Sequence, residues 1–240
     1  MDLHAALTTT GAIRDFTAVP VDDATLAHVL DVARFAPSGG NRQGWRVIVV
    51  KDPTIRRSLR DLYLTGWYDY LAQRAAGLTP WSPLADRDAE ARAVGGAPAI
   101  AASASPDGFA ERLDEVPVLL AITVDLAELA AVDRDLDRYT FAGAASVYPF
   151  AWSVLLAARD VGLGGVLTTM VIRREPDVRA LLGVPDGHAI AALIALGHPV
   201  KSFSKLTRGP VSSFTTVDRY DGDPFDGETS DGGALDGGAS

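Results

Sequence analysis

The chain has 240 residues, of which 48% are hydrophobic and 22% charged, as expected for a globular protein with a substantial core. It contains no cysteine, which excludes disulfides, cysteine zinc sites and thiol catalysis. The four histidines (His4, His28, His188 and His198) show no metal-ligand spacing, so we expect no metal site.

The net charge of −9 is concentrated at the C-terminal end. Residues 221–240 hold five Asp, one Glu and no Lys or Arg, which leaves only −3 for residues 1–220. The sequence has no block of basic residues, so we expect no nucleic-acid partner. The Gly- and Asp-rich tail offers too little apolar surface to offset its ordering entropy. The sequence therefore predicts a single domain over residues 1–220 and a disordered tail over 221–240.

Residues 139–158 are uncharged and long enough to span a bilayer. Their Ala, Ser and Gly content, with Pro149 in the middle, makes transfer into lipid unfavourable. We interpret this segment as a helix in the core or at an oligomer interface. Because the N-terminal sequence also lacks the basic and apolar regions of a signal peptide, we expect a cytoplasmic protein with no membrane partner.

Capping residues and apolar spacing predict the elements in chain order. Asp22 caps a helix that stops before Pro37, and residues 45–50 form a buried strand. Asp52 and Pro53 open a helix that runs to about residue 71. The later elements are a strand at 116–124, a helix at 139–161, a short helix at 176–182, a strand at 188–196 and a short strand at 211–217. The strands do not recur in βαβ units, which favours an α+β fold.

The most informative segment is residues 36–45, with the sequence APSGGNRQGW, between a predicted helix and a predicted strand. Ser38, Asn41 and Gln43 supply neutral groups that can donate and accept hydrogen bonds at the edge of a flat heterocycle. Gly39 and Gly40 allow the backbone to approach a ligand closely. A polar turn that merely caps the helix and the strand is the alternative interpretation. Standard hydrolase, metalloprotease, P-loop and GxGxxG motifs do not occur in the sequence.

Six segments in order resemble the nitroreductase family. They are IRDF at 13–16, the loop 36–45, the Ala-rich run closing on GLG at 157–164, LGVP at 182–185, GHP at 197–199 and RGP at 208–210. The resemblance spans about residues 8–218. It implies a central, mostly antiparallel sheet flanked by helices, in an intertwined symmetric homodimer whose central helix is 139–161.

The resemblance also implies an FMN site. Arg14 matches an arginine that binds the FMN phosphate and Arg208 matches its C-terminal partner, and planar guanidiniums bind phosphate oxygens in pairs. Positions that line the ribityl chain and the isoalloxazine are matched by Pro37, Ser38, Gly39, Asn41 and Gln43. Thr169 and Met170 match the place where a backbone N–H faces the flavin N5 region.

The chain departs from the family pattern at three places. Thr10 and Ala12 stand where many relatives carry an Arg and a Ser, so at least one phosphate donor is missing unless the Thr10 hydroxyl substitutes. Gly44 replaces the usual Pro before Trp45. Residues 167–170 read LTTM, where relatives often show Gly or Glu.

In such an enzyme the flavin carries the redox chemistry and the protein supplies binding and orientation. NADH or NADPH would reduce the flavin at N5, and an electron-poor small molecule such as a nitroaromatic or a quinone would then be reduced in the same site. No catalytic side chain is predicted. Aromatic residues of a possible substrate lid gather in 61–97: Tyr63, Trp67, Tyr68, Tyr70 and Trp81. The alternatives are a flavin-sequestering protein without reductase activity and a dehalogenating or flavin-consuming enzyme on the same fold.

Overall fold

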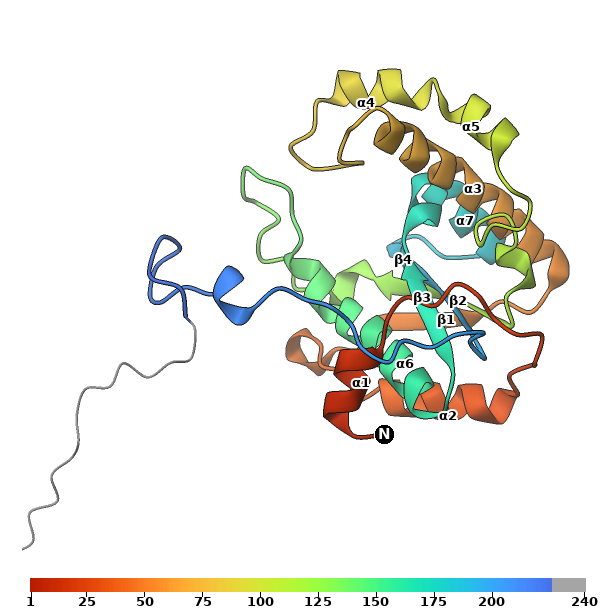
Figure 1. The fold of residues 1–240 in the computed structure, drawn as a ribbon, viewed down its shortest axis with the longest axis horizontal. Coiled ribbons are helices and arrows are strands. Elements are labelled where there is room, and N and C mark those ends of the chain that lie inside the picture. The colour runs from red at the N-terminus through yellow and green to blue at the C-terminus, as the bar shows by residue number, and fades with distance from the viewer. Residues whose placement is uncertain (226–240) are drawn as a thin grey trace, which may run out of the picture. The chain divides into compact units, whose positions relative to one another are not determined.

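The computed structural model describes residues 1–225, which divide into two units after residue 204. The first unit contains one four-stranded sheet (Figure 1), with strands β1 (Trp45–Val49), β2 (Val118–Asp125), β3 (Gly164–Thr168) and β4 (His188–Gly197). In the second unit, residues 205–225 contain one 3-10 turn, η6 (Val211–Ser213). Residues 226–240, most of the predicted tail, lie outside the described part, so the domain limits at 220 and 221 stay predictions.

The strands lie in the order β1-β2-β4-β3 and every pair is antiparallel. Trp45 of β1 is opposite Val124, Asp125 of β2 is opposite His188, and Thr168 of β3 is opposite Leu193. β1 and β3 are therefore the two edges. Because β1 runs in the same direction as β4 and β3 runs against it, the beginning of β1 and the end of β3 point toward the same end of the sheet.

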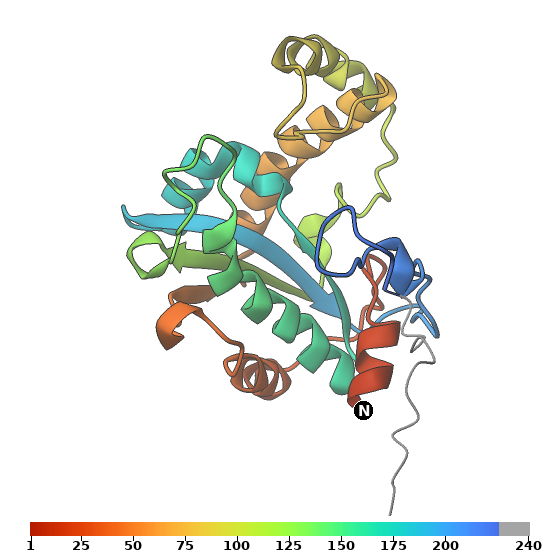
Figure 2. The ribbon, with the colours of Figure 1, turned by 90° about the vertical axis from the view of Figure 1, so that its left-hand side faces the viewer.

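The two central strands are buried on both faces. Along β2, Leu120 and Ile122 belong to one apolar core, and Leu119 and Ala121 belong to the other. Burial on both faces explains why β2 and β4 are continuous apolar runs without alternation. Helices α2 (Asp23–Ala33) and α6 (Tyr148–Asp160) cover the first face, and α3 (Pro53–Ala75) and α7 (Glu175–Leu182) cover the second (Figure 2).

Three further helices complete the first unit: α1 (Leu3–Thr9), α4 (Arg87–Val94) and α5 (Ala97–Ser103). Both α4 and α5 pack along α3 on the side away from the sheet (Figure 1). The predicted lid region 61–97 contains most of α3 and all of α4, and α5 begins at its last residue. The predicted α+β class, with an antiparallel sheet flanked by helices, is confirmed.

Most predicted elements agree with the structure, including the N-caps Asp22 and Asp52, whose carboxylates accept from Thr25 N at 2.6 Å and from Thr54 N at 2.8 Å. The predicted helix over 139–161 is wrong at its start. The helix begins at Tyr148, with Pro149 in its first turn, where a missing N–H removes no helical bond. The predicted strand at 211–217 is also wrong. That segment contains the turn η6 and a single bridge from Thr216 to Pro224.

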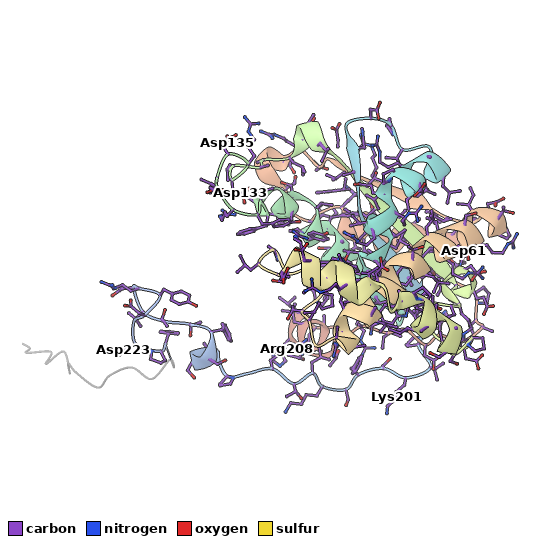
Figure 3. All side chains as sticks on the ribbon, turned by 90° about the horizontal axis from the view of Figure 1, so that it is seen from above. Asp61, Asp133, Asp135, Lys201, Arg208 and Asp223 are labelled. Atoms are coloured by element: carbon purple, nitrogen blue, oxygen red, sulfur yellow. The ribbon has the colours of Figure 1, made fainter. Side chains whose placement is uncertain are left out.

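The residues before α6 form a loop that is organised by Asp133. Its buried carboxylate accepts hydrogen bonds from the Thr140 hydroxyl at 2.7 Å, from the Phe141 N–H at 2.9 Å and from Arg138 at 2.9 Å. Backbone and side-chain donors lower the pKa of Asp133, so its charge is kept. Asp135, two residues on, is exposed in the same loop (Figure 3). No helix among the described residues is long and apolar enough to cross a membrane.

Candidate functional site

A cavity of about 320 Å³ opens between α3, the segment before β2 and the end of β3. We call it the aromatic cavity. Its walls are Arg14, Tyr63, Trp67, Tyr70, Gly108, Phe109, Ala110, Glu111, Leu167, Thr168, Thr169 and Met170. Three predicted site residues (Arg14, Thr169 and Met170) and three predicted lid aromatics (Tyr63, Trp67 and Tyr70) thus meet here, although the chain separates the first from the last by more than a hundred positions. The arrangement offers flat apolar surfaces together with one guanidinium and one carboxylate.

The aromatic wall is a stacked series along α3. The ring centroids of Tyr63 and Trp67 are 6.5 Å apart, those of Trp67 and Tyr70 are 5.5 Å apart, and Trp81 follows Tyr70 at 6.1 Å. The spacing of three to four residues places the first three rings on one face of the helix. Rings in offset stacks favour one another beyond their buried area, so they form a firm wall.

A glycine holds this wall against the end of β3. A Cβ added to Gly66 would lie 2.5 Å from the Met170 carbonyl oxygen, so α3 approaches the turn at Thr169 and Met170 as closely as a backbone can. Met170 opens the 3-10 helix η5 (Met170–Arg174), and the Tyr63 hydroxyl lies 3.3 Å from the Thr168 hydroxyl. Burial raises the pKa of Tyr63, an effect that the hydrogen bond with Thr168 and the charge of Arg14 oppose.

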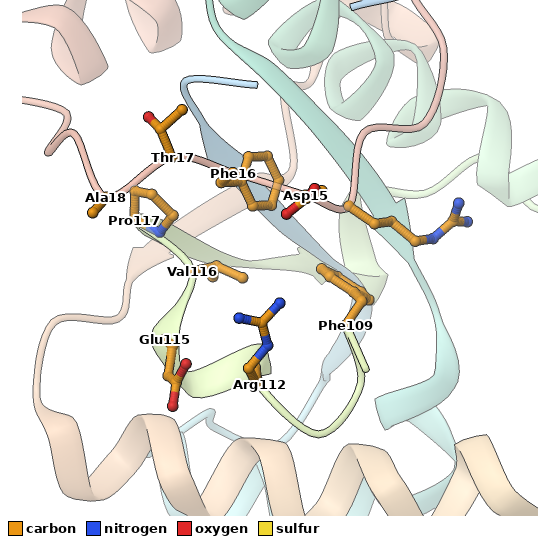
Figure 4. Close-up of a pocket in the computed structure, with 10 residues that line it drawn as sticks. Asp15, Phe16, Thr17, Ala18, Phe109, Arg112, Glu115, Val116 and Pro117 are labelled. Atoms are coloured by element: carbon orange, nitrogen blue, oxygen red, sulfur yellow. The ribbon is translucent and has the colours of Figure 1, made fainter. Parts of the chain in front are cut away.

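A second cavity, of about 200 Å³, shares Arg14 and Phe109 with the aromatic cavity (Figure 4). We call it the guanidinium cavity because Arg112 also lines it. Arg112 donates from Nε to the Asp107 carbonyl at 3.2 Å. Asp15 and Glu115 also line this cavity, so its two guanidiniums are matched by two carboxylates. Arg14 is the guanidinium shared with the flat apolar walls of the aromatic cavity, where a planar fork can bind an anionic group. Sequence reasoning missed Arg112, because only the fold brings residues 109–117 beside residues 14–18.

The aromatic cavity also contains Glu111, which sequence reasoning missed as well. The Tyr68 hydroxyl donates to Glu111 Oε1 at 2.9 Å. Burial and this hydrogen bond raise the pKa of Tyr68 to about 12. Glu111 Oε2 lies over Gly108, where a Cβ would come within 2.0 Å of it. Tyr68, which was predicted as a lid aromatic, therefore acts here as a partner for a carboxylate.

In the predicted loop 36–45, residues 40–43 are exposed, whereas both ends (Ala36, Gly44 and Trp45) are buried, and the loop is internally bonded. Ser38 Oγ accepts from the Gln43 N–H at 3.0 Å, and the Gln43 amide donates to Asn41 Oδ1 at 3.2 Å. Gly39 donates its N–H to Ser146 Oγ at 3.1 Å. Asn41 and Gln43 both have φ of 53°, in the left-handed region that disfavours side chains. Residues with strained backbone conformations cluster at binding sites, which favours a ligand-binding loop. The hydrogen bonds within the loop are also those expected of the alternative, a turn that caps the helix and the strand.

This loop does not line the aromatic cavity. It precedes β1 at one edge of the sheet, whereas Thr169 and Met170 follow β3 at the other edge. Three strand spacings, about 14 Å in total, separate the two edges. Within residues 1–225 the structure therefore brings Arg14, Thr169 and Met170 together and leaves Pro37, Ser38, Gly39, Asn41 and Gln43 apart from them.

Two other predicted contributors have distinct surroundings. Arg208 belongs to the second unit, is exposed, and donates from Nη1 to the Thr207 carbonyl at 2.7 Å (Figure 3). Thr10 is buried and its hydroxyl donates to the Ala6 carbonyl at 2.7 Å, which ends α1. The idea that the Thr10 hydroxyl replaces the missing phosphate donor is therefore not supported, because that hydroxyl already caps the helix.

The model of the nitroreductase family matches residues 8–198. The chain belongs to the nitroreductase family. It is 28% identical over 202 residues to "NADH dehydrogenase" of Thermus thermophilus, covering 84% of this chain and 88% of that protein. It is 29% identical to 5,6-dimethylbenzimidazole synthase of Rhodospirillum rubrum, covering 81% and 82% respectively. The predicted family is confirmed, and with it the predicted enzyme class, an NAD(P)H-dependent oxidoreductase.

Solved structures support the fold of this nitroreductase-family chain. The NADPH:FMN oxidoreductase of Vibrio harveyi, solved with NAD+, has a TM-score of 0.60 at 20% identity, over 90% of this chain and 76% of that one. A BluB-like flavoprotein of Clostridium difficile has a TM-score of 0.63 at 18% identity, over 91% of this chain and 100% of that one. At such identities the likeness concerns the fold and leaves the substrate open.

Proposed function

We propose that this nitroreductase-family chain binds FMN and uses NADH or NADPH to reduce an electron-poor small molecule. One observation carries the proposal: Arg14, the aromatic wall of α3 and the turn at Thr169 and Met170 surround a single cavity although the chain separates them widely. This combination suits a flat ring system with an anionic tail.

The residues present fit FMN. The isoalloxazine ring suits the flat apolar walls of the aromatic cavity, and the phosphate suits Arg14 at the guanidinium cavity. Arg208 remains the proposed second phosphate ligand by family position, and Arg112 is a second candidate by geometry. Backbone N–H groups at Thr169 and Met170 are the proposed donors to the flavin ring.

Bound FMN would supply hydride acceptance and donation, the chemistry that no side chain of this protein provides. The protein's own residues bind and orient. Arg14 fixes one end of the cofactor, the wall of Tyr63, Trp67 and Tyr70 excludes water, and the close contact of Gly66 with Met170 sets the width of the cavity. We assign no side chain as a proton donor.

We further propose a symmetric homodimer in which loop 37–43 of a second copy completes the aromatic cavity. The loop and the cavity lie at opposite edges of one sheet, so both sets of predicted ligands can serve one flavin when two copies pair. The exposed face of α6 supports this pairing, because Trp152 and Tyr148 remain 40% and 36% exposed on a helix whose other face is buried in the core. The expected cytoplasmic location stays a prediction.

An anaerobic titration tests the function. Purified protein loaded with FMN is mixed with NADH or NADPH and the flavin absorbance near the visible maximum is followed. Bleaching, and its reversal by a nitroaromatic or a quinone, is the expected result. Stable binding of FMN without bleaching by either nucleotide would favour the flavin-sequestering alternative and would overturn the reductase.

A dehalogenating enzyme is the second candidate, and one relative favours it. The chain is 25% identical over 201 residues to iodotyrosine deiodinase 1 of Rattus norvegicus, covering 82% of this chain and 62% of that protein. Release of halide from a halogenated phenol by the reduced protein, measured with a halide electrode beside nitroaromatic reduction, distinguishes the two activities.

A further inference from the structure

Glu111 is the acidic side chain of the aromatic cavity, and its position is fixed on one side. Tyr68 holds Oε1 at 2.9 Å, and Gly108 leaves the space that Oε2 occupies. The proposed FMN site does not use this carboxylate. Because Glu111 is half-buried and Tyr68 engages only Oε1, the carboxylate can offer Oε2 to a cationic partner.

The aromatic rings around Glu111 favour a cationic partner, as the carboxylate itself does. Trp67, Tyr70 and Phe109 line the cavity with Glu111, and aromatic faces attract cations through the negative charge of their π systems. Arg14 is the opposing charge in this cavity. Once a phosphate dianion binds Arg14, as in the proposed function, that positive charge is neutralised and Glu111 dominates the field.

We propose that the aromatic cavity selects planar aromatic acceptors that carry a positively charged group, with Glu111 as the residue that determines this specificity. The acceptor's ring stacks against the aromatic wall. Its cationic group pairs with Oε2 of Glu111, the oxygen that Tyr68 does not engage. Tyr68 is a positioning residue that holds the carboxylate for this contact. This inference rests on the proposed function, in which Arg14 binds the phosphate of FMN.

Three nitroaromatics of equal size test the selection: 4-nitrobenzylamine (an ammonium at neutral pH), 4-nitrobenzyl alcohol and 4-nitrobenzoate. Their kcat/KM values are measured with the FMN-loaded protein and NADH or NADPH. Their Kd values are measured on the same protein without nucleotide, from quenching of tryptophan fluorescence, since Trp67 forms the wall. We expect the ammonium to bind about tenfold or more tightly than the carboxylate, given one charged contact with cation–π support.

The variant Glu111→Gln keeps the size of the side chain and can still accept from Tyr68. Each acceptor is compared between variant and wild type, so differences in intrinsic reactivity cancel. We expect the preference for the ammonium to fall to within about twofold, while the alcohol is unaffected. Tyr68→Phe should reduce the preference in part, with an unchanged Kd for the alcohol. Asp107→Asn, an exposed carboxylate outside the cavity wall, is the matched control and should leave all three values unchanged.

The outcomes test the cation preference and the proposed reductase function separately. If NAD(P)H bleaches the flavin but the three acceptors bind alike, or if Glu111→Gln leaves a preference intact, the inference is wrong and the reductase stands. If quenching shows a preference that depends on Glu111 but NAD(P)H does not bleach the flavin, the cation site stands and the reductase is wrong. Gly108→Ala, which would displace Oε2, gives a second route to the same loss of preference.

Discussion

The two edges of the sheet carry the two halves of the predicted flavin site in different ways. At the β3 edge, Arg14, Thr169 and the α3 aromatics surround a cavity. At the β1 edge, loop 37–43 is exposed, strained and bonded mainly to itself. The β3 edge is a site with walls, whereas the ligand-type groups of loop 37–43 lie outside the aromatic cavity. This difference is the basis of our proposal that one copy supplies the pocket and a second copy supplies its cover.

Breaking the pairing of two copies gives the largest expected effect. Trp152→Glu places a charge on the exposed face of α6, which should yield monomers and lower FMN affinity by about a hundredfold, since a desolvated interface does not tolerate an unpaired charge. Light scattering and flavin fluorescence titration measure both. Tyr220→Glu, at an exposed aromatic of the second unit, is the control. A Trp152→Glu monomer that kept full FMN affinity would show that one copy contains the whole site.

The β3 edge is tested by its arginine. Arg14→Ala removes a charge-assisted bond worth roughly 1.5–3 kcal/mol, so FMN affinity should fall by about tenfold to a hundredfold. Riboflavin has no phosphate, and its weaker binding should hardly change. Equal losses for the two flavins would instead make Arg14 a structural residue.

For the second phosphate ligand, the family position and the geometry of this chain point to different residues. The family position gives Arg208, and the geometry gives Arg112. If Arg208 completes the clamp, as its family position implies, Arg208→Ala should weaken FMN selectively by about tenfold while Arg112→Ala changes little. The reverse pattern would favour Arg112, which lines the guanidinium cavity with Arg14. Isothermal titration with FMN and riboflavin for each variant distinguishes the two results.

The β1 edge gives the smallest effect. Asn41→Ala removes neutral hydrogen bonds worth about 0.5–1.5 kcal/mol, so both flavins should bind about threefold to tenfold more weakly. A contact with the ring or the ribityl chain does not depend on the phosphate. Loss of FMN alone would place the loop near the phosphate, and no loss for either flavin would leave loop 37–43 as a capping turn. Arg42→Ala, an exposed neighbour in the loop, serves as the control.

The sequence predicted elements well where local signals act alone. The N-caps Asp22 and Asp52 lie where their carboxylates accept backbone donors, and the apolar runs at 118–125 and 188–197 are strands. Sequence reasoning failed where contacts between distant segments decide the local structure, as at β3. Gly164 and Gly165 open β3, and without a side-chain pattern they resemble a loop. Cβ atoms there would meet Ile13 at 2.8 Å and the Ala195 carbonyl at 2.5 Å, so close packing selects glycine.

By itself, the sequence determined the family and the α+β class, because these depend on ordered motifs and local periodicity, and it nominated Arg14 as the proposed phosphate ligand. Only the tertiary structure decided which of the candidate residues share a cavity. It separated loop 37–43 from Arg14 by the width of the sheet, and it added Glu111 and Arg112 from a segment with no motif. Strand order and long-range packing fix such neighbours, and neither is encoded in the spacing of residues along the chain.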